Sequence, residues 1–176
     1  MASDDRTHIF KIAVVGSGSV GKTSTILRYT TDTFTEQYIP TLGVGLANKD
    51  VDLPEGLVRL VIWDMGGQEH LGKVRANFYK GASGVLFVYD VTQRDSFKEI
   101  DQWKKEVDAS LLEYEALLIA NKIDLVDDQS VTREEGEHLG EKMGATYLET
   151  SAKIGLMVEE AFKTISKLMI ETFHPT

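Results

Sequence analysis

The sequence contains no cysteine among its 176 residues. This absence excludes disulfides, thiolate metal sites, thiol catalysis and the attachment of prenyl or palmitoyl groups within these residues. Residue 2 is alanine rather than glycine, so the start carries no signal for myristoylation. No apolar run is long enough to cross a bilayer, and the polar start MASDDRTH lacks the apolar core of a signal peptide. We therefore expect a cytoplasmic protein without an intrinsic membrane anchor, recruited to membranes by partners or by a tail outside these residues.

Positive charge is also scarce: the chain has 19 Lys and Arg residues against 28 Asp and Glu residues, which gives a formal net charge of −9. Such a chain repels nucleic acid and anionic membranes through its overall field, so we expect no nucleic-acid partner, although a local pocket can still hold a polyanion. The length and the 42% hydrophobic content fit one globular domain. We assign this domain to residues 8–172, with a flexible N-terminus at 1–7 and a tail at 173–176, and expect a monomer.

Apolar runs alternate with amphipathic segments along the whole chain. We expect strands at 9–15, 46–53, 57–64, 84–90, 116–122 and 145–150, the second and third joined as a hairpin by the turn PEG. We expect helices at 22–32, 95–111, 132–143 and 154–170. The strands show little alternation, which is typical of parallel sheets covered on both faces, so the pattern predicts a doubly wound α/β fold. Trp63 and Trp103 are most simply core residues.

The stretch GSGSVGKT at residues 16–23 lies between a predicted strand and a predicted helix. It matches the phosphate-loop pattern G-x-x-x-x-G-K-[ST] with Gly16, Gly21, Lys22 and Thr23. Glycines let successive N–H groups face one concavity, and the start of a helix favours anions. The pattern assigns nucleotide phosphates to Lys22 and Mg²⁺ to the Thr23 hydroxyl. The loop alone leaves kinases and ATPases open as alternatives.

A second polar segment, WDMGGQEH at 63–70, closes the strand LVRLVIW. Asp64, at the carboxyl end of this strand, is a candidate for holding Mg²⁺. Gly67 can offer its backbone N–H to a γ-phosphate without a side chain in the way, and Gln68 can orient an attacking water. Beside a phosphate loop, this segment indicates chemistry at the γ-phosphate rather than a simple turn.

The motif ANKID follows a buried strand and provides Asn121 and Asp124. Open α/β sheets bind ligands at such strand ends. A carboxylate at this point can accept from the ring N–H and the exocyclic amino group of guanine, a donor pair that adenine lacks, so Asp124 predicts guanine specificity. The segment TSAKIG follows the next strand and can present the backbone N–H of Ala152 to the base oxygen.

The polar loop TFTEQYIPT spans residues 33–41, between the first helix and the hairpin. Its position in the chain makes Thr41 a candidate for contacts with Mg²⁺ and the γ-phosphate. Phe34 is a candidate for lying against the edge of the base. The four histidines (His8, His70, His138 and His174) lack the spacing of metal ligands and are interpreted as surface or structural residues.

Taken in order, GSGSVGKT, Thr41, DMGGQ, NKID and TSAK resemble the five guanine-nucleotide motifs of the Ras-like small GTPases. The resemblance covers about residues 8–172, and segments such as FYKGASGVLFVYDVTQRDSF and YLETSAK are similar to the Rab branch. It implies a P-loop NTPase three-layer sandwich, with a six-stranded, mostly parallel sheet, one antiparallel edge strand and about five helices. It also implies a GTP/GDP switch with Mg²⁺, in which residues 35–45 and 66–79 bind an exchange factor, a GTPase-activating protein and effectors.

The resemblance assigns three groups of site residues. Catalysis is assigned to Gln68, which would orient the hydrolytic water, with Lys22 and Thr41. Metal binding is assigned to Thr23, Thr41 and Asp64. Nucleotide binding is assigned to Gly16, Ser17, Gly18, Ser19, Val20, Gly21, Lys22, Thr23, Ser24, Phe34, Thr41, Gly67, Asn121, Lys122, Asp124, Ser151, Ala152 and Lys153.

The sequence departs from the Rab pattern at the second switch. Rab and Ras proteins usually carry Thr-Ala where this chain has Met65 and Gly66, and a second glycine before the glutamine is the habit of Arf-like proteins. No arginine is positioned by a motif to assist hydrolysis in cis, and Arg75 is interpreted as a solvated surface residue. The leading hypothesis is a slow GTP hydrolase, and the alternatives are a GTP-dependent docking module with negligible hydrolysis and a P-loop kinase or ATPase.

Overall fold

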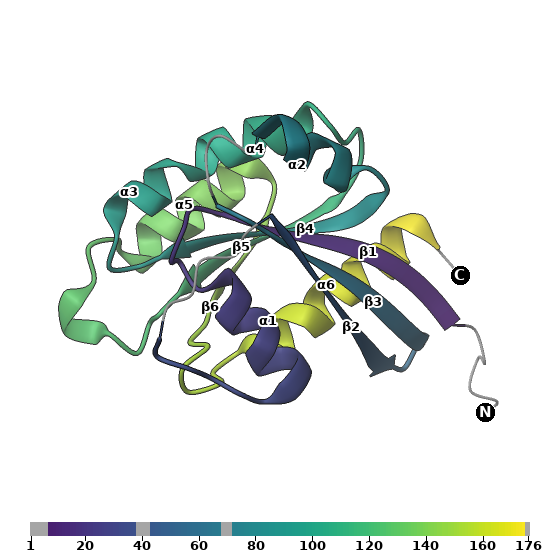
Figure 1. Cartoon of the computed structure of the whole chain (residues 1–176), viewed down its shortest axis with the longest axis horizontal. Coiled ribbons are helices and arrows are strands. Elements are labelled where there is room, and N and C mark those ends of the chain that lie inside the picture. Colours follow the sequence, from purple (N-terminus) through teal and green to yellow (C-terminus); the bar gives the residue numbers. More distant parts are fainter. Residues whose placement is uncertain (1–6, 38–42, 68–71, 175–176) are drawn as a thin grey trace.

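The computed structural model describes residues 7–37, 43–67 and 72–174. Six strands form one sheet in the order β2-β3-β1-β4-β5-β6 (Figure 1). Only the edge pair β2 and β3 is antiparallel among the described strand pairs, so the predicted α/β fold with one antiparallel edge strand is confirmed. The strands are β1 (Thr7–Val15), β2 (Val44–Leu53), β3 (Gly56–Met65), β4 (Ala82–Asp90), β5 (Glu115–Asn121) and β6 (Thr146–Glu149).

Helices cover both faces of the sheet, which gives the predicted three layers. Helices α1 and α6 lie on one face, and α2, α3, α4 and α5 lie on the other (Figure 1). The helices are α1 (Lys22–Thr31), α2 (Gly72–Tyr79), α3 (Arg94–Lys98), α4 (Ile100–Asp108), α5 (Arg133–Met143) and α6 (Val158–Phe173), with a short 3₁₀ turn at Val126–Asp128. Within the described residues, no helix has both the length and the apolar character that a membrane span needs.

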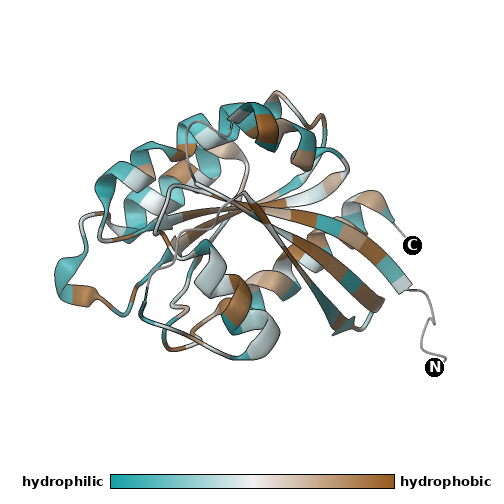
Figure 2. Ribbon diagram, in the orientation of Figure 1, coloured by the Kyte–Doolittle hydropathy of each residue, from teal (hydrophilic) through white to brown (hydrophobic). Residues whose placement is uncertain are grey.

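The core is double because alternate side chains of the central strands enter opposite faces. On β1, Phe10 and Ile12 pack toward α1 and α6, whereas Ala13 and Val15 pack toward the opposite helices. Figure 2 shows the central strands as mainly hydrophobic, with interruptions by hydrophilic residues, between helices of mixed hydropathy. Full burial of an aliphatic side chain stabilises the folded state by about 1.5–3 kcal/mol. Because both faces of the central strands are buried, hydrophobic residues occupy successive positions there and do not alternate with polar ones.

Two predicted helices differ from the structure. The helix expected at 95–111 is interrupted at Glu99 between α3 and α4, and it ends at Asp108. The helix expected at 154–170 begins only at Val158, because Gly155 and Met157 have left-handed φ angles of 74° and 57°. Ile154, expected on the buried helical face, is 63% exposed.

The start of α5 follows the prediction from local sequence. Thr132 caps the helix by accepting from the backbone N–H of Glu135, and the Glu135 carboxylate accepts from the backbone N–H of Thr132. This reciprocal pair satisfies two N–H groups that a helix start otherwise leaves unpaired.

The three histidines that the structure describes lie away from the predicted nucleotide site. The rings of His8 and His174 are 5.2 Å apart beside Phe10, where the start of β1 meets the end of α6. His138 is exposed on α5, and His70 lies outside the described residues. The interpretation of His8 and His174 as structural residues agrees with these aromatic contacts.

Candidate functional site

The phosphate loop connects the end of β1 to the start of α1 and depends on two glycines. Gly16 and Gly21 have φ angles of 146° and 100°, which L side chains rarely adopt. A Cβ atom at Gly16 would lie 2.2 Å from the carbonyl oxygen of Val88, and one at Gly21 would lie 2.3 Å from Nδ2 of Asn121. Both positions therefore need glycine for conformation and for space.

Lys22 begins α1 and reaches back across the loop. Its ammonium group donates to the carbonyl oxygens of Gly16 and Ser17, each at 2.7 Å. The residue is buried, and burial is the main reason why the pKa of Lys22 is lowered to about 8; the charge of Asp64 opposes this shift, and the charge of Arg75 adds to it. A cation held in this concavity is positioned to receive a phosphate anion.

The two described candidates for metal binding meet at the next strand end. The Thr23 hydroxyl donates to Oδ2 of Asp64 at 2.5 Å, which joins the start of α1 to the end of β3. Gly67 follows β3 and lies directly against the phosphate loop, since a Cβ atom there would lie 2.5 Å from the backbone nitrogen of Gly18. The loop and the start of the second switch are thus in van der Waals contact.

The side chains of the ANKID motif lie at the end of β5 and reach the phosphate loop. Asn121 donates to the carbonyl oxygen of Val20 at 3.0 Å, and Lys122 donates to that of Ser19 at 2.8 Å. Lys122 also pairs with the buried carboxylate of Asp90 at 2.7 Å. These bonds hold the phosphate loop and the predicted base-reading segment in one rigid unit.

The segment after β6 completes this unit. Ser151 donates to Oδ1 of Asp124 at 2.6 Å, and the backbone N–H of Ala152 donates to Oδ1 of Asn121 at 3.2 Å. On the other side of the opening, Glu36 pairs with the ammonium group of Lys153 at 3.0 Å. The loop that follows α1 and the segment after β6 therefore lie face to face.

A cavity of about 580 Å³ runs between these segments, which is the size of a typical small-molecule site. It lies at the carboxyl ends of the parallel strands, where α/β sheets bind ligands. Thr41 and Gln68, two of the predicted catalytic residues, lie outside the described residues. The lining residues are Gly18, Ser19, Gly21, Lys22, Thr23, Ser24, Leu27, Phe34, Thr35, Glu36, Gln37, Gly67, Asn121, Lys122, Asp124, Leu125, Ala152 and Lys153.

The prediction for Arg75 is wrong, because this residue is buried and only 3% exposed. Its guanidinium group forms a two-point pair with Glu106 at 2.7 and 2.9 Å and donates to the carbonyl oxygen of Gly66 at 3.1 Å. It also lies 4.5 Å from the centre of the Trp103 ring. Arg75 thus anchors α2, a helix that the sequence pattern did not predict, onto α4.

Sequence reasoning missed several residues around the cavity. Asp90 ends an apolar strand, and this position is the one signal that could have identified it as the partner of Lys122. Leu27 and Leu125 supply apolar walls, but isolated leucines in a helix and a loop carry no motif. Of the remaining described residues that were predicted to bind nucleotide, Ser17, Val20 and Ser151 adjoin lining residues along the chain, and Gly16 lies two positions before Gly18.

Comparison with known proteins agrees with this geometry. The model of the Ras family matches residues 11–171. The chain is 39% identical to the GTP-binding protein ypt1 of Schizosaccharomyces pombe, over 93% of this chain and 81% of the relative. It is 40% identical to the Ras-related protein Rab-1 of Theileria annulata, over 92% of this chain and 74% of that relative. The chain therefore belongs to the Ras family, as a small GTPase that binds guanine nucleotides and hydrolyses GTP.

Proposed function

We propose that this small GTPase is a Rab-like switch that regulates membrane traffic or signalling through effectors selective for its GTP form. One observation carries the proposal: a single cavity joins the phosphate loop, the ANKID side chains and the segment after β6. The similarity to a protein named Rab-1 supports the Rab branch. The glycine at position 66 is an Arf-like feature within this Rab-like chain, and it adds backbone freedom at the start of the second switch.

The phosphate end of the cavity suits Mg²⁺. The oxygens of Thr23 and Asp64 lie 2.5 Å apart, and a donor set made only of oxygens is the kind that Mg²⁺ prefers. We assign these two residues, together with Thr41, as the protein ligands of the ion. When bound, Mg²⁺ supplies charge neutralisation between the β- and γ-phosphates.

We assign the phosphates to the loop 16–24 and the base to the opposite end of the cavity. Lys22 contributes a cation, and Gly67 contributes a backbone N–H to the γ-phosphate. Asp124 accepts from the ring N–H and the amino group of guanine, and the Ala152 N–H donates to the base oxygen. Lys122, Ser151 and Lys153 support these contacts, and Phe34 packs at the edge of the base.

Hydrolysis is assigned to a water oriented by Gln68, with Lys22 and Thr41 at the γ-phosphate. Arg75 pairs with Glu106, so we give it no direct role in neutralising charge at the phosphates. We therefore expect slow hydrolysis by the protein alone and a gain of about 10³–10⁵-fold from a partner that supplies an arginine. We further propose that one domain, residues 8–172, carries this activity as a cytoplasmic monomer, and that residues 35–45 and 66–79 bind its regulators and effectors.

A competition experiment tests the assignment of the base. The protein is loaded with a fluorescent GDP analogue in the presence of Mg²⁺, and unlabelled GTP or ATP displaces it. A site whose hydrogen-bonding groups are left unpaired by the wrong base discriminates by about 10⁴-fold or more, so GTP is expected to compete far better than ATP. Equal competition by ATP would contradict the roles of Asp124 and Ala152.

A further inference from the structure

Arg28 lies on α1, outside the residues that line the nucleotide cavity, and reaches the segment after β6. Its Nε donates to the carbonyl oxygen of Ala152 at 2.8 Å, and its Nη2 donates to that of Lys153 at 2.7 Å. The two acceptors are consecutive carbonyls, and the planar guanidinium fork suits such a pair of acceptors. The guanidinium group presents a separate nitrogen to each carbonyl in one fixed plane, so it sets the direction of both hydrogen bonds.

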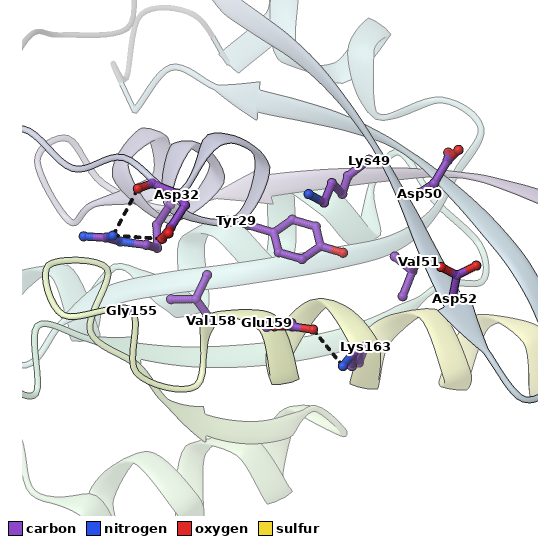
Figure 3. Close-up of a pocket in the computed structure, with 11 residues that line it drawn as sticks. Tyr29, Asp32, Lys49, Asp50, Val51, Asp52, Gly155, Val158, Glu159 and Lys163 are labelled. Atoms are coloured by element: carbon purple, nitrogen blue, oxygen red, sulfur yellow. Dashed lines mark hydrogen bonds and ion pairs between the residues drawn. The ribbon is translucent and has the colours of Figure 1, made fainter.

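The remaining nitrogen of Arg28 is held by the end of its own helix. Nη1 donates to the side-chain and backbone oxygens of Asp32, at 3.0 and 3.3 Å. Dashed lines at Asp32 in Figure 3 mark these bonds at the end of α1, beside a second pocket that Arg28 and Asp32 help to line. The Arg28 side chain is only 19% exposed. Since all three nitrogens have partners, the orientation of the guanidinium group is determined on both sides.

The segment itself is closed around this side chain. Ser151 and Leu156 exchange two backbone hydrogen bonds, at 3.1 and 3.0 Å. Gly155, between them, has a φ of 74°, and a Cβ atom there would lie 3.6 Å from Cδ of Arg28. The glycine therefore lets the backbone turn directly over the aliphatic part of the Arg28 side chain.

Holding these carbonyls also determines where the neighbouring N–H groups point. In a planar trans peptide the C=O and the N–H point in opposite directions. The carbonyl of Ala152 faces Arg28, so the N–H of Lys153 in the same peptide unit points away from Arg28. Ala152 and Lys153 both line the nucleotide cavity, whereas Arg28 does not. The bond from Arg28 to the Ala152 carbonyl thus orients the N–H of Lys153 on the other side of the segment.

We propose that Arg28 is a positioning residue that orients the backbone N–H of Lys153 and holds residues 152–153 beside the base, and thereby sets the discrimination of the atom at position 6 of the purine. This inference rests on the proposed reading of guanine by the segment after β6. It separates two parts of base recognition: the segment that Arg28 holds acts at position 6, whereas the Asp124 carboxylate acts at position 2. It also joins the two ends of the site, because α1 begins at the phosphates with Lys22 and holds the base segment through Arg28.

The test measures binding of three diphosphates to the wild type and to Arg28→Ala. Guanosine diphosphate is compared with 6-thioguanosine diphosphate, which changes only the atom at position 6, and with inosine diphosphate, which lacks only the 2-amino group. In Arg28→Ala, we expect the preference for GDP over the 6-thio analogue to fall about tenfold, the effect of one misplaced hydrogen bond. The preference for GDP over inosine diphosphate should stay within about twofold of the wild type.

Three variants accompany this measurement. Arg28→Lys keeps the charge and the helix but loses the planar fork, so it should give part of the loss even if Arg28→Ala folds poorly. Asp32→Ala removes only the outer partner of the guanidinium group and should change the preference at position 6 less than Arg28→Ala does. Arg133→Ala removes an exposed arginine that pairs with Glu137 on α5 and should change neither preference.

An equal loss of affinity for all three diphosphates would overturn the inference, since Arg28 would then act only on stability. Unchanged preferences in both Arg28 variants would overturn it as well. Failure of the proposed function gives a different result, because the wild type itself would then bind GDP and ADP equally well, and the inference would fall with it. A fall confined to the 6-thio comparison would support the role of Arg28.

Discussion

At the scale of single residues, glycines decide how closely the second switch approaches the phosphate loop. A Cβ atom at Gly67 would lie 2.5 Å from the nitrogen of Gly18, 2.7 Å from the carbonyl carbon of Ser17 and 2.9 Å from the carbonyl oxygen of Gly16. All three are backbone atoms, so no side chain can move aside to make room. A substitution at this position must displace the switch itself.

We therefore expect Gly67→Ala to weaken the binding of a non-hydrolysable GTP analogue by about tenfold or more, while GDP binding changes by less than about threefold. The reason is that only the γ-phosphate uses the Gly67 N–H in our assignment. Gly72→Ala, in the same switch, is the matched control, because its new Cβ would meet only ordinary contacts at 3.5–3.6 Å. Titration calorimetry with both nucleotides measures the two affinities, and an equal loss for both would contradict the assignment.

A second residue-scale prediction concerns Gln68. We expect Gln68→Leu to slow GTP hydrolysis by about 100-fold, because the water loses the group that orients it, while the affinity for GTP stays near the wild-type value. Single-turnover hydrolysis of bound GTP measures the rate. An unchanged rate would favour the alternative of a GTP-dependent docking module.

The burial of Arg75 could not be predicted from the sequence around it. Arginine is mostly exposed in proteins, and nothing within several residues of Arg75 indicates burial. Its partner Glu106 lies 31 positions further along the chain, and Trp103 lies nearby on the same helix as Glu106. Only the packing of α2 against α4 brings the three together, and that packing has no local sequence signal.

At the scale of elements, the ion pair between Arg75 and Glu106 fixes how α2 packs against α4. Burial of Glu106 acts to raise the pKa of its carboxyl, but hydrogen bonds from Arg75 and Tyr79 outweigh this effect and bring the pKa below its ordinary value of 4.5. A carboxyl whose pKa is depressed by folding stabilises the protein above its unfolded pKa. That stability is lost as the pH falls through the lower, folded pKa.

Arg75→Ala should therefore destabilise the protein by about 3 kcal/mol at neutral pH, since it leaves the half-buried Glu106 without its cation. Urea denaturation measures the free energy of unfolding. In Glu106→Gln, the loss of stability below about pH 4.5 should be shallower than in the wild type. Parallel acid profiles for both proteins would contradict the role of this carboxylate.

Elements with a local signal followed their predictions more closely than those without one. Thr132 and Glu135 form a capping box that predicts the start of α5, and the helix begins there. The start of α6 is instead delayed by a left-handed turn at Met157, a non-glycine residue whose conformation the sequence does not indicate. Helical periodicity continued through that turn, so the prediction began four residues too early.

At the scale of the whole molecule, the class of fold could be predicted because most strands are apolar runs and several of them are followed by a recognisable motif. The motifs lie at strand ends, and parallel strands bring those ends to one edge of the sheet. The contacts that tie the motifs together could not be predicted. Lys122 bridging Ser19 and Asp90, and Arg28 holding Ala152, depend on side-chain reach across the assembled fold.

This architecture predicts where a change of nucleotide alters the protein. The rigid unit around β4 and β5 should exchange amide hydrogens equally slowly with GDP and with a GTP analogue. Residues 35–45 and 66–79 should become more protected with the analogue, because the γ-phosphate holds both segments. Hydrogen exchange followed by mass spectrometry compares the two states, and equal protection in these segments would contradict a switch.

The central claim is that the cavity reads a guanine nucleotide. The most direct measurement is to purify the protein, denature it and identify the nucleotide that is released. We predict guanine nucleotide, mostly as GDP, because the site discriminates the base through Asp124 and hydrolysis is complete before release. Release of an adenine nucleotide would contradict the account.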